Sequence, residues 1–467
     1  MTEPRNALSR RVLDEYEAAR ASLPPGIVTP ERRQEAIQAL AARGLPTTRD
    51  ENWRYTNLRS LEKARFAPIA QPVPPPAETE LPGRLTGFAR YTFVDGVFAR
   101  ELSSPQEQGG LMVRLMRGTH GSAGNQAPAG SQGSAKQQGS AAHAGSATVF
   151  NLPRALPALS SLPEARLALL NEAFATDGAV IHVSGTSAEP ARVELLFIAV
   201  AGADVGASYP RVQVSLDAGS RLILVERHIG AGTGASFVNS SVSVDVGHGA
   251  HLTHYRLQQA GARATWFDTL SAVLAVDARY DLLAVNTGAL SARSTTHVQM
   301  AGAGAELVLS MAALGDRQQV QDNFALVEHI APRARTEQTF RGIASGRARV
   351  AFNGKIVVRE AAAGTDSRQS LRGLLAGPEA EIDARPQLEI YTDDVRCSHG
   401  ATAGKLDDNM LFYLLSRGLS PEVAQRLLKW AFLEDVVSKI DLPELRRQIE
   451  HALAGQMADA ASLKELL

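Results

Sequence analysis

Residues 218–226 read AGSRLILVE, and a small turn followed by an apolar strand returns as HGAHLTHYRL at 248–257, DARYDLLAV at 277–285 and GAGAELVLS at 302–310. The turns recur with a period of roughly 28 residues, at Gly219, Gly249, Ala278 and Gly304, and Gly346 to Gly377 adds another step. A short unit of strand and turn repeated at a nearly fixed period is typical of a solenoid. We therefore predict a β-helix or a related stacked β-solenoid, with a β-sandwich of evenly spaced hairpins as the alternative.

The composition on either side of these repeats divides the chain. We predict an N-terminal helical or mixed domain at 1–117, a β-helix core at 148–405 and a C-terminal helical domain at 406–467. Between the first two lies 118–147, which consists almost entirely of small and polar residues. Such a segment buries too little apolar surface to offset the entropy of ordering, so we predict a disordered insertion there.

Capping residues and turns predict the elements outside the core. Helices are expected at 5–22, 30–43, 50–61 and 163–175, and the pair Asp95–Gly96 predicts a hairpin turn within 91–101. Two further helices are expected after the core, one capped by Asp407 and one by Ser420. A third is expected to open at 441–444, where DLPE resembles a capping box.

Charge and cysteine content exclude several classes of function. The formal net charge is -1 in 467 residues, which gives no electrostatic case for binding nucleic acid or an anionic membrane. A single cysteine excludes an intrachain disulfide, and the N-terminal residues lack the apolar core of a signal peptide. The longest apolar stretch, 193–203, is too short to span a bilayer. We expect a cytoplasmic protein without a membrane anchor.

The only cysteine, Cys397, lies two residues before His399 at the end of the strand-rich region. Side chains at positions i and i+2 of a strand point to the same face, so the thiol and the imidazole should project together. Two ligands cannot complete a metal or cluster site, which needs about four. The pair is therefore either structural or one part of a site that another chain completes.

Other readings of the candidate residues remain open at this point. Cys397 with His399 as its base could serve a cysteine-dependent transferase, and a β-helix could carry a carbohydrate-active enzyme, although aromatic residues make up only 5% of the chain. His248, His251 and His254 are not expected to form a metal site, because His251 should face away from the other two. The arginines between 333 and 349 are expected on a solvated face.

The stretch from 329 to 440 resembles the SufB/SufD family of iron-sulfur cluster assembly proteins. The matching runs are RTEQTFRGIASGRARVAFNGKIVV at 335–358, QLEIYTDDVRCSHGATAGKLD at 387–407 and LFYLLSRGLSPEVAQRLLKWAF at 411–432. The run DENWRYTNL at 50–58 and the absence of a second cysteine resemble the SufD branch. The insertion at 118–147 departs from the family.

This resemblance implies a right-handed parallel β-helix flanked by helices, in a non-enzymatic scaffold subunit. It implies pairing with SufB through the end of the β-helix, where His399, with the adjacent family cysteine Cys397, would contribute to a transient iron-sulfur cluster. It implies that the C-terminal helices bind the ATPase SufC, and we expect the contact to include Leu411, Phe412, Arg417, Leu427, Leu428 and Phe432. Reduced flavin is linked to the assembled complex, no tightly bound cofactor is expected on the isolated chain, and a homodimer could form without SufB.

Overall fold

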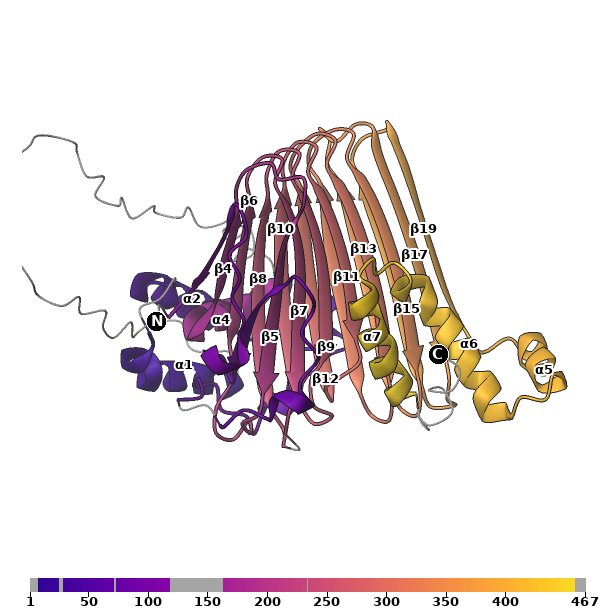
Figure 1. Ribbon diagram of the computed structural model, residues 1–467, viewed down its shortest axis with the longest axis horizontal. Coiled ribbons are helices and arrows are strands. Elements are labelled where there is room, and N and C mark those ends of the chain that lie inside the picture. The colour runs from indigo at the N-terminus through magenta and orange to yellow at the C-terminus, as the bar shows by residue number, and fades with distance from the viewer. Residues whose placement is uncertain (1–6, 25–27, 71–72, 118–162, 233, 458–467) are drawn as a thin grey trace, which may run out of the picture.

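The structure is a computed structural model that describes residues 7–24, 28–70, 73–117, 163–232 and 234–457. These residues form a β-solenoid with helices at both ends (Figure 1). The segment 118–147, for which we predicted a disordered insertion, lies outside the described residues. The solenoid confirms the predicted fold class and is inconsistent with the β-sandwich alternative, because consecutive strands alternate between two sheets.

Each strand of the solenoid pairs in parallel with the strand two positions later in the chain, so two strands make one turn. We call the two sheets the β5–β19 sheet and the β4–β18 sheet. The first contains β1 (Ala89–Val94), β2 (Val97–Phe98), β5 (Ala191–Ala199), β7 (Arg221–Gly230), β9 (His251–Gln259), β11 (Arg279–Asn286), β13 (Glu306–Gly315), β15 (Arg335–Ala344), β17 (Thr365–Leu375) and β19 (Val395–Gly404). The second contains β3 (Leu111–Leu115), β4 (Asp177–Val183), β6 (Pro210–Leu216), β8 (Phe237–Val246), β10 (Thr265–Leu274), β12 (Ser291–Met300), β14 (Val320–His329), β16 (Arg349–Val358) and β18 (Glu381–Ile390).

The turns that lead into the β5–β19 sheet repeat one backbone conformation. At the equivalent position of six turns the residue has a left-handed φ between 53° and 75°, and these residues are Gly219, Gly249, Asp277, Gly304, Arg333 and Gly364. Glycine and, less readily, aspartate tolerate this conformation. The repeat residue of the third turn is therefore Asp277 and not Ala278, as the sequence suggested. Gly346 belongs to the opposite rim of the solenoid, between β15 and β16.

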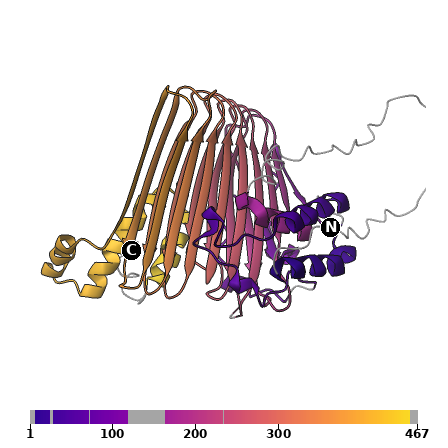
Figure 2. The same ribbon diagram turned by 180° about the vertical axis from the view of Figure 1, so that it is seen from behind.

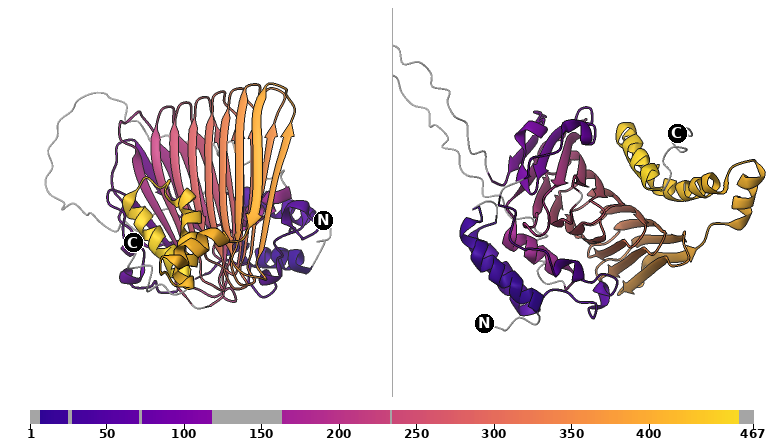
Figure 3. Two further views of the ribbon diagram at one scale, coloured as in Figure 1. Left: turned by 90° about the vertical axis from the view of Figure 1, so that its right-hand side faces the viewer. Right: turned by 90° about the horizontal axis from the view of Figure 1, so that it is seen from below.

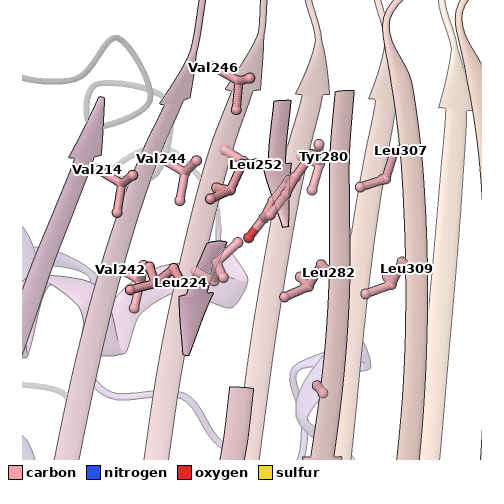
Figure 4. Close-up of a cluster of buried hydrophobic side chains, with 14 of the residues drawn as sticks. Val214, Leu224, Val242, Val244, Val246, Leu252, Tyr280, Leu282, Leu307 and Leu309 are labelled. Atoms are coloured by element: carbon pink, nitrogen blue, oxygen red, sulfur yellow. The ribbon is translucent and has the colours of Figure 1, made fainter. Parts of the chain in front are cut away.

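The core fills the space between the two sheets. Alternate residues of each strand point inward, so Leu252 of β9 is fully buried while its neighbour Thr253 faces outward. Figure 4 shows the two inner faces meeting, with valines from β6 and β8 opposite leucines from β7, β9, β11 and β13. Burial of apolar area at about 25 cal/mol per Å² along the whole length stabilises the stack.

The N-terminal helices and the segment around Trp53 pack on the outer face of the β4–β18 sheet (Figure 2), whereas Leu85 and Phe88 pack on the outer face of the β5–β19 sheet. The α-helices of this N-terminal region are α1 (Ala7–Ala19), α2 (Pro30–Arg43) and α4 (Arg166–Phe174). Its 3-10 turns are η1 (Arg20–Ser22), η2 (Glu51–Trp53), η3 (Arg59–Leu61), η4 (Glu78–Glu80), η5 (Arg100–Leu102) and η6 (Pro163–Ala165). Thr29 caps α2 as predicted, with its side chain accepting from the Arg32 amide at 3.3 Å. The Asp95–Gly96 hairpin between β1 and β2 is also confirmed.

The helix predicted at 50–61 is wrong, since that segment contains only η2 and η3. Contacts to the solenoid explain the difference. The Arg293 guanidinium lies 4.4 Å from the centre of the buried Trp53 ring, and the Thr56 hydroxyl donates to Asp322 at 2.7 Å. The segment therefore follows the outer surface of the sheet instead of closing hydrogen bonds with itself.

The C-terminal helices are α5 (Asp408–Ser416), α6 (Pro421–Val437) and α7 (Pro443–Gln456). Asp407 and Ser420 cap α5 and α6 as predicted. The capping box predicted at 441–444 is wrong, because α7 begins at Pro443 without a side-chain cap and Glu444 accepts from the Thr86 amide instead. No helix among the described residues is long and apolar enough to cross a membrane.

Helices α6 and α7 lie against the outer face of the β5–β19 sheet, whereas α5 extends beyond the end of the solenoid (Figures 1 and 3). Arg341 of β15 is buried beneath α6, and its Nε donates to Asp435 at 2.7 Å. The prediction that the arginines of this region lie on a solvated face is therefore wrong for Arg341, because α6 covers it.

We expect Leu252→Ala to lower the free energy of unfolding by about 2–5 kcal/mol, because it leaves a cavity between the sheets. Thr253→Ala, the matched control on the outer face of the same strand, should change it by no more than about 0.5 kcal/mol. Thermal and urea unfolding followed by circular dichroism would measure both variants. Equal effects would contradict the inward and outward assignment.

Candidate functional site

The solenoid ends in two strands that have a partner on one side only. β19 pairs with β17, and β18 pairs with β16, each at the end of its sheet. Most residues of β19 are exposed, and Ile390 and Tyr391 present apolar surface beside it. An unpaired strand edge offers backbone donors and acceptors to another strand. This open end therefore presents two strand edges without a partner among the described residues.

Cys397 and His399 lie on this last strand. Cys397 is half-buried and packs against the core cluster, while His399 is exposed. Strand alternation places both side chains on the inner face of β19, as the spacing predicted. The side chains of Cys397 and His399 therefore point toward the interior at the open end of the solenoid.

Directly beneath this pair lies a polar ladder that the sequence analysis missed. Ser367 of β17 is in register with Cys397, and Gln369 is in register with His399. Both are buried, and the Ser367 Oγ and Gln369 Oε1 atoms have no hydrogen-bond partner among the described residues. The signal was present as S-x-Q at 367–369, one turn before C-x-H at 397–399, but only the register aligns the two pairs.

The environment of Cys397 opposes ionisation of its thiol. Burial raises the pKa of Cys397, the carboxylate of Asp366 raises it further, and the backbone amide of Ser367 partly counteracts both. A nucleophilic cysteine needs a lowered pKa and a hydrogen-bonded base. No hydrogen bond joins Cys397 to His399 in the part of the chain that the structure describes. These features disfavour the transferase alternative.

The described residues contain no group of three or more His, Cys, Asp or Glu side chains arranged to hold a metal ion. Cys397 and His399 alone would leave a tetrahedral ion or an iron-sulfur cluster short of about two ligands. The described residues therefore supply at most part of a metal site at this pair.

The three clustered histidines occupy three different environments. His251 faces outward and forms a 2.7 Å contact with Asp281, whereas His254 is fully buried between the sheets and lies 3.1 Å from the Tyr280 hydroxyl. His248 is in a turn, 3.0 Å from the carbonyl oxygen of Val276. His251 thus faces away from His254, as alternation predicted.

A second exposed feature is α5, where no residue is buried. Phe412 is 72% exposed, Met410 60% and Tyr413 56%, and the Arg417 guanidinium lies 5.1 Å from the Tyr413 ring centre. Among the other residues predicted to bind SufC, Leu411, Leu427, Leu428 and Phe432 are partly buried. Single exposed apolar residues are ordinary, but several on one protruding helix indicate a binding surface.

A groove of about 410 Å³ connects this helix to the open end of the solenoid. It is lined by Gly373 and Leu374 of β17, Thr402 to Asp407, Met410 of α5, and Leu428, Ala431 and Phe432 of α6, together with Arg372. Two residues predicted to bind the ATPase, Leu428 and Phe432, therefore share a groove with the last strand that carries Cys397.

Because the pKa of Cys397 is raised, we expect slow alkylation near neutral pH. The rate of reaction with iodoacetamide should increase with pH, with a midpoint above the ordinary thiol value of about 8.5. Asp366→Asn removes the nearby negative charge and should move this midpoint to lower pH. Fast alkylation at pH 7, or a midpoint that Asp366→Asn leaves in place, would contradict this account.

Comparison with known proteins agrees with the resemblance in the sequence. The family model of the SUF system FeS cluster assembly, SufBD core domain, matches residues 197–432. The iron-sulfur cluster assembly protein SufD of Escherichia coli is 30% identical over 89% of this chain and 90% of its own length. The SufBD family protein slr0076 of Synechocystis is 27% identical over 91% of this chain and 90% of its own length. The chloroplastic protein ABCI7 of Arabidopsis thaliana is 30% identical over 53% of each chain.

The matched core domain begins in β5 and ends within α6, so it contains the open end, Cys397 and His399. The match to SufD extends to the N-terminal region as well, because it covers 420 residues. The protein belongs to the SufBD family of iron-sulfur cluster assembly proteins.

Proposed function

We propose that this chain is the SufD-like scaffold subunit of a SufBCD-type complex. In this role the open end of the solenoid pairs with a SufB-type partner, and Cys397 and His399 supply part of the site where an iron-sulfur cluster is assembled. The observation that carries the proposal is that one thiol and one imidazole lie together on a terminal strand that has a partner on one side only. The cluster is cargo of the complex, not a resident cofactor of this chain.

The ligand deficit supports a shared site. A cluster held between two chains needs each chain to provide only part of its ligands, and the strand edges give a geometric way to bring the two parts together. The same edge in the isolated protein would be available to a second copy of the chain, which accounts for the expected homodimer. Such a subunit would work in the cytoplasm, and reduced flavin would bind in the assembled complex.

The C-terminal helices are proposed to bind a SufC-type ATPase. α5 presents an apolar surface away from the solenoid, and α6 continues from it onto the β5–β19 sheet. Arg341 and Asp435 join α6 to β15 at 2.7 Å, two strands from β19. A displacement of α5 by the ATPase would therefore pass to α6 and from α6 to β15.

The role of His399 is tested by His399→Ala in the complex co-expressed with its SufB-type and SufC-type partners. We expect bound iron and sulfide after anaerobic purification to fall at least about tenfold, because an essential ligand is lost. Ser398→Ala, whose side chain lies on the opposite face of β19, is the matched control and should leave the cluster content unchanged. Normal cluster content with His399→Ala would refute the ligand role.

The role of α5 is tested by Phe412→Asp, at a position where the folded chain tolerates a charge because the side chain is exposed. Burial of such a phenylalanine at an interface contributes about 1.5–3 kcal/mol, so binding to the ATPase should weaken by more than tenfold. Val205→Asp, another exposed apolar position at the far end of the solenoid, is the control. Retained co-purification of the ATPase with Phe412→Asp would show that α5 is not the binding element.

A further inference from the structure

Gln369, the residue of β17 in register with His399, has a side-chain amide in which only the nitrogen forms a hydrogen bond. Gln369 Nε2 donates to Gln338 Oε1 of β15 at 2.7 Å, while Gln369 Oε1 has no partner among the described residues. Gln369 is 3% exposed, so this oxygen has no ready access to bulk water. A buried acceptor without a donor costs about 1–3 kcal/mol. The structure keeps such an atom directly below a proposed metal ligand.

The order of the strands indicates that Gln369 Oε1 points toward β19. β15 and β19 lie on opposite sides of β17, so an amide whose nitrogen points toward β15 turns its oxygen toward β19. The residue of β19 in register with Gln369 is His399, and neighbouring strands lie about 4.8 Å apart. Because β17 and β19 are neighbours, rotation of the exposed His399 side chain can bring an imidazole N–H to this oxygen.

A glycine on the opposite sheet lies against this amide. A Cβ atom at Gly354 of β16 would lie only 2.2 Å from Gln369 Nε2. Only glycine leaves room for the Gln369 amide against this strand. The hydrogen bond to Gln338 thus restrains the amide, and Gly354 leaves the space that it occupies.

We propose that Gln369 is a positioning residue that accepts a hydrogen bond from one ring N–H of His399, and so presents the other ring nitrogen to the metal. A histidine ligand generally donates its second N–H to an oxygen, which fixes both its tautomer and its ring orientation. Gln369 supplies that oxygen, Gln338 restrains its amide, and Gly354 leaves the space for it. This inference rests on the proposed ligand role of His399.

The test uses the full-length chain in complex with its SufB-type partner, which supplies the remaining ligands, with Zn²⁺ as the probe under anaerobic conditions at pH 8. Gln369→Leu should weaken Zn²⁺ binding about 10- to 100-fold, the usual loss when the partner of a ligating histidine is removed. Gln369→Glu keeps an acceptor at the same place and should retain most of the affinity. Gln321→Leu removes a different interior glutamine, equally buried in β14, and should leave binding unchanged.

A second measurement determines which ring nitrogen of His399 carries the proton. With ring-¹⁵N-labelled histidine, the Zn²⁺-loaded wild type should show His399 as one tautomer, with one nitrogen protonated and the other shifted by the metal. In Gln369→Leu the two tautomers should mix. Gly354→Ala should have the same effect because it displaces the amide, although it removes no hydrogen-bonding group.

The outcomes separate this inference from the proposed function. If His399→Ala leaves Zn²⁺ binding unchanged, the ligand role of His399 fails. If His399→Ala weakens binding but Gln369→Leu does not, or if the tautomer is the same in both proteins, only the positioning role of Gln369 is overturned. Equal melting temperatures of Gln369→Leu and Gln321→Leu would show that a loss of binding is not a loss of folding.

Discussion

The parallel, in-register pairing of each strand with the strand one turn away is the constraint on which the rest of the structure depends. It places residues about 28 positions apart in columns along the solenoid, so that every inward side chain stacks on an inward side chain of the next turn. Many of these columns are apolar and form the core, while Glu226, His254 and Arg256 form a buried polar cluster within it. A single residue of slippage would turn the whole inner face outward, so the register is strongly fixed.

The same columns change character near the open end. The column that ends at His399 contains Leu282 and Leu309 in the middle of the solenoid, and then Gln338 and Gln369. The column that ends at Cys397 likewise changes from Leu307 to Thr336 and Ser367. Buried polar groups are costly unless they have partners. Ser367 and Gln369 lie one turn from the open end, directly next to Cys397 and His399.

The helices at the two ends of the chain cover different faces and have different consequences. The N-terminal region closes the outer face of the β4–β18 sheet through Trp53, Arg293 and Asp322. α6 and α7 cover the β5–β19 sheet, and α5 continues past it. The strand edges of β18 and β19 remain uncovered between these two regions. The exposed strand β19 and the exposed helix α5 therefore lie at the same end of the molecule.

The sequence by itself determined the repeat, the sites of most turns and caps, and the family, because strand alternation, left-handed turn residues and helix caps are local properties. It also determined that Cys397 and His399 share a face. It could not place Arg333 in the column of left-handed residues, since arginine does not indicate that conformation, and it mistook 50–61 for a helix because the contacts of Trp53 and Thr56 come from residues more than 200 positions away. The alignment of Gln369 under His399 was likewise decided by tertiary structure, because only the pairing of strands brings residues one solenoid turn apart into contact.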